Sequence, residues 1–210
     1  MTRGRFITLE GGEGVGKSTQ VEALAAALRE RGLDVVVTRE PGGSEGAEAI
    51  RGLLLGGSDD RWGPQAEALL FAAARTDHVD KLIRPALEAG KWVLSDRFVD
   101  SSLAYQGGAG GLGVEAVRAI NAFGIGESFP DRTLVLVLAE GAEGAERARA
   151  RDSEGSDRIG GRSRTYHERV ETAFRLIAAE EPQRVRIVDA SGPRDDVTER
   201  LLAAIADLLP

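Results

Sequence analysis

The sequence predicts an α/β fold in which a five-stranded parallel sheet is covered by helices on both faces. Short apolar runs recur along the chain, segments with helical periodicity separate them, and the two kinds of element alternate throughout. Continuously apolar runs of this length are typical of strands in a buried parallel sheet. In such a sheet, ligands bind beyond the carboxyl ends of the strands, so we expect the functional residues directly after the apolar runs.

Five segments are predicted as strands because each is short and almost wholly apolar. In chain order they are 6–9, 35–37, 92–94, 134–138 and 185–188. The segments between them are rich in Ala, Leu, Glu and Arg, which favour helices. The predicted helices are 20–31, about 44–55, 64–88, 114–123, 141–151, 165–181 and 195–208. Glycine-rich stretches are expected to form turns or loops at 42–46, 56–57, 107–113 and 160–161.

Length and composition limit the functions that the chain can have. With 210 residues and 42% apolar side chains, we expect one compact domain over residues 1–210. The net charge of −7 provides no basic surface for a nucleic acid, so no nucleic-acid partner is expected. The apolar run at the N-terminus is too short for a signal peptide, and no segment is apolar enough to span a membrane, so we expect no membrane partner and a cytoplasmic location. The absence of cysteine excludes disulfides and zinc sites built on sulfur. The kind of metal site still open to the chain is one that binds a hard cation through oxygen.

A phosphate-binding loop follows the first predicted strand. The segment matches the pattern G-x-x-x-x-G-K-[ST] and leads into a helix, so strand, loop and helix occur in the required order. A glycine-rich turn that matches by chance is the alternative, and the flanking elements argue against it. Lys17 is expected to reach the β- and γ-phosphates of ATP, and the Ser18 hydroxyl is expected to bind Mg²⁺. The predicted ATP-binding residues are Gly11, Gly12, Glu13, Gly14, Val15, Gly16, Lys17, Ser18 and Thr19. The motif assigns the sheet to the three-layer P-loop NTPase fold.

Among P-loop proteins, a kinase for a small substrate fits this chain best. The only asparagine is Asn121, so the Asn-Lys-x-Asp segment by which GTPases read guanine is absent. Motor and transporter ATPases normally couple hydrolysis to partner chains, whereas a small kinase needs a second phosphate site and a positively charged closing element. Residues 147–164 are polar, charged and rich in arginine, which is typical of a lid.

Asp96 and Arg97 follow a predicted strand directly and should lie across from the phosphate loop. The carboxylate can hold the waters of Mg²⁺, and the guanidinium can bind a phosphate. A strand-ending turn with a surface ion pair is the alternative. Phe71 and Arg75 are four residues apart on a predicted helix, so they share a face and could bind a base together. Spacing alone does not separate this from a core phenylalanine beside a solvated arginine.

Taken together, the motifs resemble those of bacterial thymidylate kinases, from about residue 5 to residue 190. Five segments occur in the order and at the spacing of that family: 10–18 (EGGEGVGKS), 38–43 (TREPGG), 70–75 (LFAAAR), 96–106 (DRFVDSSLAYQ) and 147–151 (RARAR). The resemblance implies an enzyme that transfers the γ-phosphoryl group of ATP to dTMP with Mg²⁺ as cofactor, giving dTDP and ADP. It also implies a homodimer.

The resemblance assigns roles in dTMP binding. Phe71 would stack on thymine, Arg75 would read its carbonyl edge, and Ser102 and Gln106 would face the base. Tyr105 would crowd the sugar C2′. The residues expected to bind dTMP are Arg39, Arg51, Phe71, Arg75, Arg97, Ser102, Tyr105 and Gln106.

The resemblance also assigns catalytic roles to Lys17, Arg97, Glu13 and Arg151. Glu13 would lie near the sugar and the Mg²⁺ waters, and Asp96 would join Ser18 in binding the metal. Because position 14 is glycine, the catalytic arginine would come from the lid, with Arg151 as the best match and Arg147, Arg149 and Arg158 as alternatives. The chain departs from the family at two positions: Gly110 replaces a common arginine, and Gly160 replaces a common glutamate.

Two other functions remain as alternatives. The first is a kinase for another nucleoside monophosphate or for a deoxynucleoside, which the base pocket would distinguish. The second is a nucleotide-binding module without catalysis, which only Gly110 and Gly160 favour.

Overall fold

A computed structural model describes residues 3–58, 60–138 and 159–210 and contains the predicted parallel sheet. The strands are β1 (Phe6–Gly11), β2 (Val35–Arg39), β3 (Trp92–Asp96), β4 (Arg132–Val137) and β5 (Val185–Asp189). They are all parallel and lie in the order β2-β3-β1-β4-β5. Asp96 pairs in register with Leu9 of β1 and with Arg39 of β2. The ends of three neighbouring strands therefore meet at one edge of the sheet.

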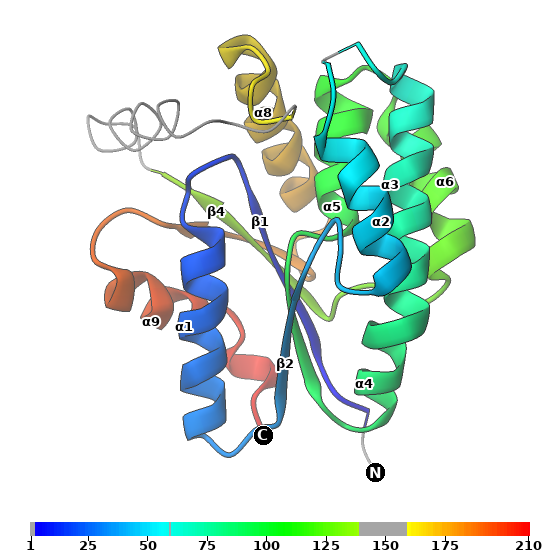
Figure 1. Ribbon diagram of the computed structural model, residues 1–210. Helices are drawn as coiled ribbons and strands as arrows, with labels where there is room; N and C mark the ends of the chain where they lie inside the picture. Colours follow the sequence, from blue (N-terminus) through cyan, green and yellow to red (C-terminus); the bar gives the residue numbers. More distant parts are fainter. Residues whose placement is uncertain (1–2, 59, 139–158) are drawn as a thin grey trace.

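Helices cover both faces of the sheet (Figure 1). One face is covered by α1 (Lys17–Glu30) and α9 (Arg194–Ala204), followed by the 3₁₀ turn η3 (Ala206–Leu208). Leu24 and Leu28 of α1 and Leu201 of α9 are fully buried in one apolar cluster with Ile7 and Leu9 of β1. This packing anchors α1, and with it the loop that precedes α1.

The other face is covered by a larger group of helical segments (Figure 1). They are α2 (Glu45–Leu55), α3 (Pro64–His78), the π-helix η1 (Val79–Ile83), α4 (Arg84–Glu88), α5 (Val99–Ser102), the π-helix η2 (Leu103–Ala109), α6 (Val114–Ile125) and α8 (Arg164–Glu180). The second apolar cluster joins Phe98, Leu103 and Phe174 of this layer to Phe6 and Val135 of the sheet. Serine caps begin two helices, because the Ser44 and Ser163 hydroxyls accept from the amides of Ala47 and Tyr166.

The structure confirms the five predicted strands and most predicted helices. Residues 64–88 are helical but change to a π-helix over η1, and the last predicted helix ends at Ala204. The predicted helix 141–151 lies outside the described residues. In the described part of the chain, no helix has the length and apolar character needed to cross a membrane.

The prediction of a loop at 107–113 is wrong for its first three residues, which belong to η2. The glycines there allow close packing rather than a turn. A Cβ on Gly108 would lie 2.7 Å from the Cβ of Ala173 in α8, and one on Gly107 would lie 3.1 Å from the Cα of Val114. Glycine therefore lets η2 approach its neighbours, a role that composition alone does not distinguish from turn formation.

Candidate active site

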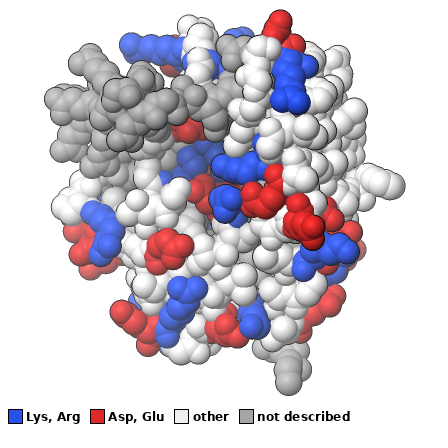
Figure 2. Space-filling model, in the orientation of Figure 1, with Lys and Arg blue, Asp and Glu red and all other residues white. Residues whose placement is uncertain are grey.

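A cavity of about 420 Å³ opens at the carboxyl edge of the sheet. Figure 2 shows Lys, Arg, Asp and Glu side chains gathered in a hollow on this face. From the phosphate loop and α1, it is lined by Glu13, Gly14, Gly16, Lys17, Ser18 and Thr19. From the other predicted site segments, it is lined by Arg39, Arg51, Phe71, Arg75, Asp96, Arg97, Ser102, Tyr105 and Gln106. The structure thus brings the two predicted halves of the site together.

The phosphate loop is shaped by glycine and by Lys17. Gly11 has φ +129°, and a Cβ there would lie 2.4 Å from the Leu136 carbonyl oxygen, so a larger residue does not fit. The Lys17 ammonium donates to the carbonyls of Gly12 at 2.6 Å and Gly11 at 3.3 Å. Gly11 and Gly12 therefore hold the lysine, while Val15 packs in the apolar core behind the loop.

Burial, together with the nearby positive charge of Arg97, lowers the pKa of Lys17 to about 8. The nearby carboxylates of Asp96 and Glu13 act in the opposite direction. An anion bound in the loop would favour the charged ammonium in the same way. The loop thus holds a desolvated positive charge where phosphates would lie.

Ser18 and Asp96 bring a hydroxyl and a carboxylate together beside the phosphate loop. The Ser18 hydroxyl donates to the Asp96 carboxylate at 2.6 Å, and the strand register brings Asp96 to this position. An all-oxygen set with one carboxylate fits Mg²⁺, which usually takes its other ligands from phosphates and water.

Arg97 crosses the cavity floor from the end of β3. Among the described residues it is the only non-glycine residue with positive φ, at 71°. Its guanidinium donates to Glu13 at 2.6 Å, to Ser101 at 3.1 Å and to the Gly11 carbonyl at 3.2 Å, and it lies 5.0 Å from the ring centroid of Tyr105. The sequence left open a surface ion pair between Asp96 and Arg97 at the strand end. In the structure Arg97 forms an ion pair with Glu13, and both residues line the cavity.

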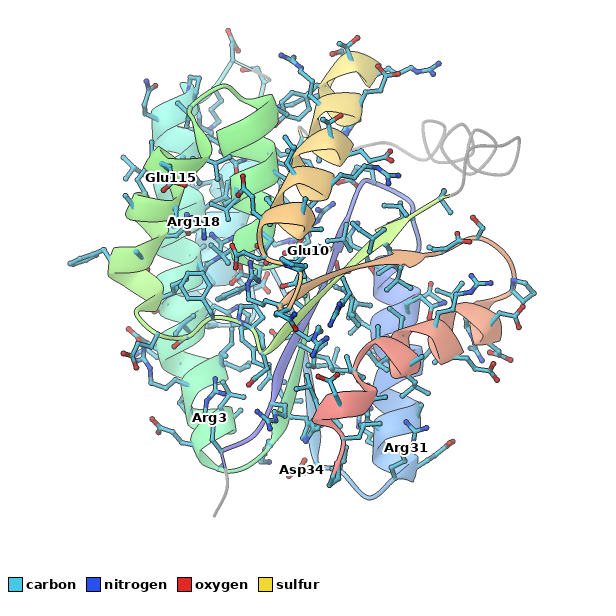
Figure 3. The ribbon with its side chains drawn as sticks, turned by 180° about the vertical axis from the view of Figure 1, so that it is seen from behind. Arg3, Glu10, Arg31, Asp34, Glu115 and Arg118 are labelled. Atoms are coloured by element: carbon cyan, nitrogen blue, oxygen red, sulfur yellow. The ribbon has the colours of Figure 1, made fainter. Side chains whose placement is uncertain are left out.

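Glu10, which the sequence analysis missed, holds the turn that presents Arg97. Its carboxylate accepts from the Phe98 amide at 2.7 Å and from the Ser101 amide at 3.2 Å and hydroxyl at 2.5 Å. Figure 3 shows Glu10 in the interior of the molecule. Burial, together with the nearby charge of Asp100, raises the pKa of Glu10 to about 8, although the hydrogen bond from the Ser101 hydroxyl opposes the shift.

Glu10 should make the stability depend on pH. Its pKa is about 8 when folded against 4.5 for the ordinary group, so the folded state binds this proton more tightly. This contribution to the free energy of unfolding is complete below pH 4.5 and is lost as the pH rises through about 8. We expect Glu10→Gln, which stays neutral, to flatten this dependence in urea unfolding between about pH 5 and pH 8. Glu171→Gln controls for the loss of one carboxylate, and equal pH slopes for wild type and Glu10→Gln would contradict the prediction.

Arg75 is buried in a polar network, with 2% of its surface exposed. Its Nε donates to Glu40 at 2.7 Å, its Nη1 to Ser102 at 2.9 Å and to Asn121, and its Nη2 to the Phe98 carbonyl at 3.1 Å. Four of the five guanidinium N–H groups thus meet protein acceptors. The described residues leave one N–H for a ligand.

Glu40 holds this network together from the loop after β2. Besides Arg75, its carboxylate contacts the Nδ1 of His78 at 3.1 Å, and the Nε2 of His78 bonds to the Thr38 hydroxyl at 2.8 Å. Phe71 is half-buried beside this network and lines the cavity. The sequence left open a core phenylalanine beside a solvated arginine. The structure shows the reverse, because Arg75 lies in the core and Phe71 lies at the cavity.

Arg39 and Arg51 line the same cavity from β2 and α2. Arg39 is exposed and pairs with Glu48 at 3.0 Å, whereas Arg51 donates to the Pro41 carbonyl at 2.6 Å. Arg151 and its alternatives Arg147, Arg149 and Arg158 lie outside the described residues.

Comparison with known proteins agrees with this geometry. The model of the family described as thymidylate kinase matches residues 9–201. The chain belongs to the thymidylate kinase family. It is 62% identical over 207 residues to the thymidylate kinase of Rhizorhabdus wittichii, and the matched region covers 99% of each chain. It is 49% identical over 210 residues to that of Bradyrhizobium diazoefficiens, which covers 99% of this chain and 92% of the relative. The crystal structure of thymidylate kinase from Ehrlichia chaffeensis matches with a TM-score of 0.77 at 30% identity, covering 97% of this chain and 99% of the other.

This membership confirms the predicted family, the P-loop fold and the enzyme class, an ATP-dependent nucleoside monophosphate kinase. Gly110 is one of the two positions at which the resemblance implies a departure from the family pattern. A Cβ there would lie 2.7 Å from the Gln106 carbonyl oxygen and 2.9 Å from that of Tyr105. The backbone of this turn therefore admits no side chain without a shift. The Gly160 carbonyl contacts His167 Nε2 at 3.2 Å.

Some residues of the site were missed by the sequence analysis. Glu40, Pro41, Leu55, Ser101 and Ile159 line the cavity, and Glu67 contacts Gln106 from behind it. Four of them had a signal in the sequence. Glu40 and Pro41 lie inside the 38–43 motif, and Ser101 lies inside the 96–106 motif. Glu67 precedes Phe71 by four residues on one helix, so it shares that face.

Proposed function

We propose that this member of the thymidylate kinase family transfers the γ-phosphoryl group of ATP to dTMP through the cavity residues described above. The observation that carries the proposal is one cavity lined by Lys17 of the phosphate loop, by Arg97, and by Phe71 and Arg75. The loop lysine suits a triphosphate, Phe71 with Arg75 suits an aromatic base, and Arg97 suits phosphate groups.

On the ATP side, residues 11–19 would wrap the phosphates, with Lys17 neutralising the β- and γ-phosphates. Ser18 and Asp96 would hold Mg²⁺, which, when bound, neutralises part of the phosphate charge. Arg97, paired with Glu13, would lie between donor and acceptor. Glu13 would thereby orient Arg97 as well as face the sugar.

On the acceptor side, a phosphate oxygen of dTMP attacks the γ-phosphorus. A bond from that oxygen to phosphorus forms, the bond from phosphorus to the β–γ bridging oxygen breaks, and ADP leaves with the bonding electrons. The attacking oxygen is already anionic, so the protein needs no strong general base, and positioning with charge neutralisation carries catalysis. Arg39 and Arg51 would bind the acceptor phosphate, and Tyr105 would lie against the sugar.

Other parts of the assignment remain predictions. We propose that residues 1–210 form one domain and that 147–164 act as its lid, with Arg151 as the catalytic arginine. The cytoplasmic location also stays a prediction.

The proposed reaction is tested by measuring ADP release with a panel of nucleoside monophosphates and thymidine. Release should be fastest with dTMP and require Mg²⁺. The Lys17→Ala variant provides the blank. A preference for dCMP, AMP or thymidine would overturn the proposed acceptor, and ATP binding without ADP release would indicate a module without catalysis.

We also propose a homodimer that uses the face formed by α2, α3 and α6, which pack side by side (Figure 1). Each helix carries an exposed large apolar side chain on this layer: Leu53 is 40% exposed, Leu69 is 56% exposed and Phe123 is 96% exposed. A second copy of the chain would cover them, since exposed apolar side chains on adjoining helices mark interaction surfaces.

Phe123→Asp should convert the dimer to a monomer, because a charge would be buried at the centre of the apolar contact. Light scattering after size exclusion measures the mass. Leu176→Asp is the matched control, since Leu176 is 60% exposed on α8 and lies outside the proposed face, and it should stay dimeric. A monomeric wild type, or a dimeric Phe123→Asp, would contradict the proposed interface.

A further inference from the structure

We propose that Glu67 is a positioning residue that sets the base preference of the site by fixing the side-chain amide of Gln106 in one orientation. This inference rests on the proposed function, in which Gln106 faces the base of the acceptor nucleotide. Glu67 touches neither nucleotide in this proposal and acts only through Gln106.

Glu67 is a buried carboxylate on α3, one helical turn before Phe71, with 3% of its surface exposed. One carboxylate oxygen accepts from the Nε2 of Gln106 at 3.0 Å. The other accepts from the Nη2 of Arg162 at 2.6 Å. The carboxylate thus connects a cavity-lining amide of η2 with a cation just before α8.

Arg162 is itself held in place by an aromatic side chain. It donates to the Tyr166 hydroxyl at 2.6 Å, and its guanidinium lies 4.7 Å from the Tyr166 ring centroid. The Tyr166 hydroxyl in turn donates to the Tyr105 carbonyl at 2.8 Å. The ion pair is therefore anchored on α8 and on η2, and Glu67 has a fixed position from which to act.

The ion pair determines which end of the Gln106 amide faces Glu67. A carboxylate paired with a guanidinium is ionised, so it can only accept hydrogen bonds. The NH₂ group of Gln106 must therefore point at Glu67, and this is the only hydrogen bond that the Gln106 side chain makes with the described residues. The side-chain carbonyl remains as an acceptor for a ligand in the cavity that Gln106 lines with Phe71 and Arg75.

A fixed acceptor at this point distinguishes pyrimidines by their hydrogen-bonding edge. Thymine and uracil carry an N–H donor at N3, whereas cytosine carries an acceptor at N3. If the Gln106 carbonyl cannot exchange places with its NH₂ group, it can accept from N3–H of thymine or uracil. At cytosine it would face the N3 acceptor instead, and two acceptors repel each other. If the amide could rotate, it could donate to cytosine, and the discrimination would weaken.

The experiment compares kcat/KM for dTMP, dUMP and dCMP in wild type and Glu67→Gln. The variant side chain has nearly the same shape but can donate as well as accept, so it no longer orients Gln106. The preference for dTMP over dCMP should fall by about tenfold or more, mainly through KM. The preference for dTMP over dUMP should stay, because the two bases share the same edge. Glu171→Gln, the same change at an exposed glutamate of α8 that pairs with Arg175, should leave all three values unchanged.

Two further variants separate the ways in which the inference could fail. Gln106→Ala should also reduce the preference for dTMP over dCMP, and Glu67→Gln added to it should have little further effect if Glu67 acts through Gln106. An unchanged preference in Gln106→Ala would overturn the base-site assignment itself. A reduced preference in Gln106→Ala with an unchanged one in Glu67→Gln would overturn only the inference.

If Glu67→Gln proves unstable, Glu67→Met gives a second test. Methionine fills a similar volume without an acceptor, and Arg162, with 26% of its side chain exposed, can turn to solvent. The preference for dTMP over dCMP should fall as in Glu67→Gln, and a wild-type preference in a folded Glu67→Met would overturn the inference.

Discussion

Lys17→Ala should lower kcat by about 10³-fold, because it removes the buried positive charge that we propose faces the transferred phosphoryl group. The Lys17 ammonium is fixed by the carbonyls of Gly11 and Gly12, so it needs no reorganisation when charge develops on the phosphates. The lowered pKa of Lys17, about 8, reflects the desolvation that makes this charge effective. The KM for dTMP should change far less than kcat, since our proposal places Lys17 at the donor nucleotide.

The measurement is steady-state ADP release with saturating ATP and dTMP. Lys91→Ala is the matched control: Lys91 forms an exposed ion pair with Asp34 at 3.2 Å, far from the cavity, and its loss should leave kcat unchanged. Circular dichroism checks that both variants fold. Turnover of Lys17→Ala within tenfold of wild type would contradict a role for Lys17 in the phosphoryl transfer.

The parts of the site that could be predicted are those set by local sequence. The phosphate loop requires glycine at Gly11 and Gly16 and a cation at Lys17, so its pattern is visible in nine residues. The carboxyl ends of parallel strands lie at one edge of the sheet, which predicts Asp96 and Arg97 near the loop. The register of β1 with β3 agrees, because it pairs Asp96 with Leu9, two residues before the loop.

The parts that could not be predicted depend on contacts between distant segments. Glu10, Glu40 and Glu67 each lie in an ordinary strand, turn or helix, and their partners are 35 or more residues away: Phe98 and Ser101 for Glu10, Arg75 for Glu40, and Gln106 for Glu67. Helical spacing showed that Phe71 and Arg75 share a face, but not which of the two lies in the core. That choice is made by Glu40, whose carboxylate gives a buried guanidinium a partner.

Glu40→Ala should lower the free energy of unfolding by about 3–5 kcal/mol, because it leaves the buried Arg75 without a countercharge. Arg75 and Glu40 have side chains that are 2% and 4% exposed, so water cannot replace the lost partner without opening the core. The same change removes the acceptor for His78 Nδ1. Glu48→Ala is the matched control: Glu48 pairs with Arg39 at an exposed site, and its loss should cost about 1 kcal/mol or less.

Urea unfolding of four proteins separates the pair from its surroundings: wild type, Glu40→Ala, Arg75→Met and the double variant. The double variant should be more stable than the sum of the two single losses predicts, since removing both charges leaves neither one buried alone. Additive losses would mean that Glu40 and Arg75 are each stabilised by other groups. The network would then be a set of separate hydrogen bonds, and the orientation of Arg75 toward the cavity would have to come from Ser102 and the Phe98 carbonyl instead.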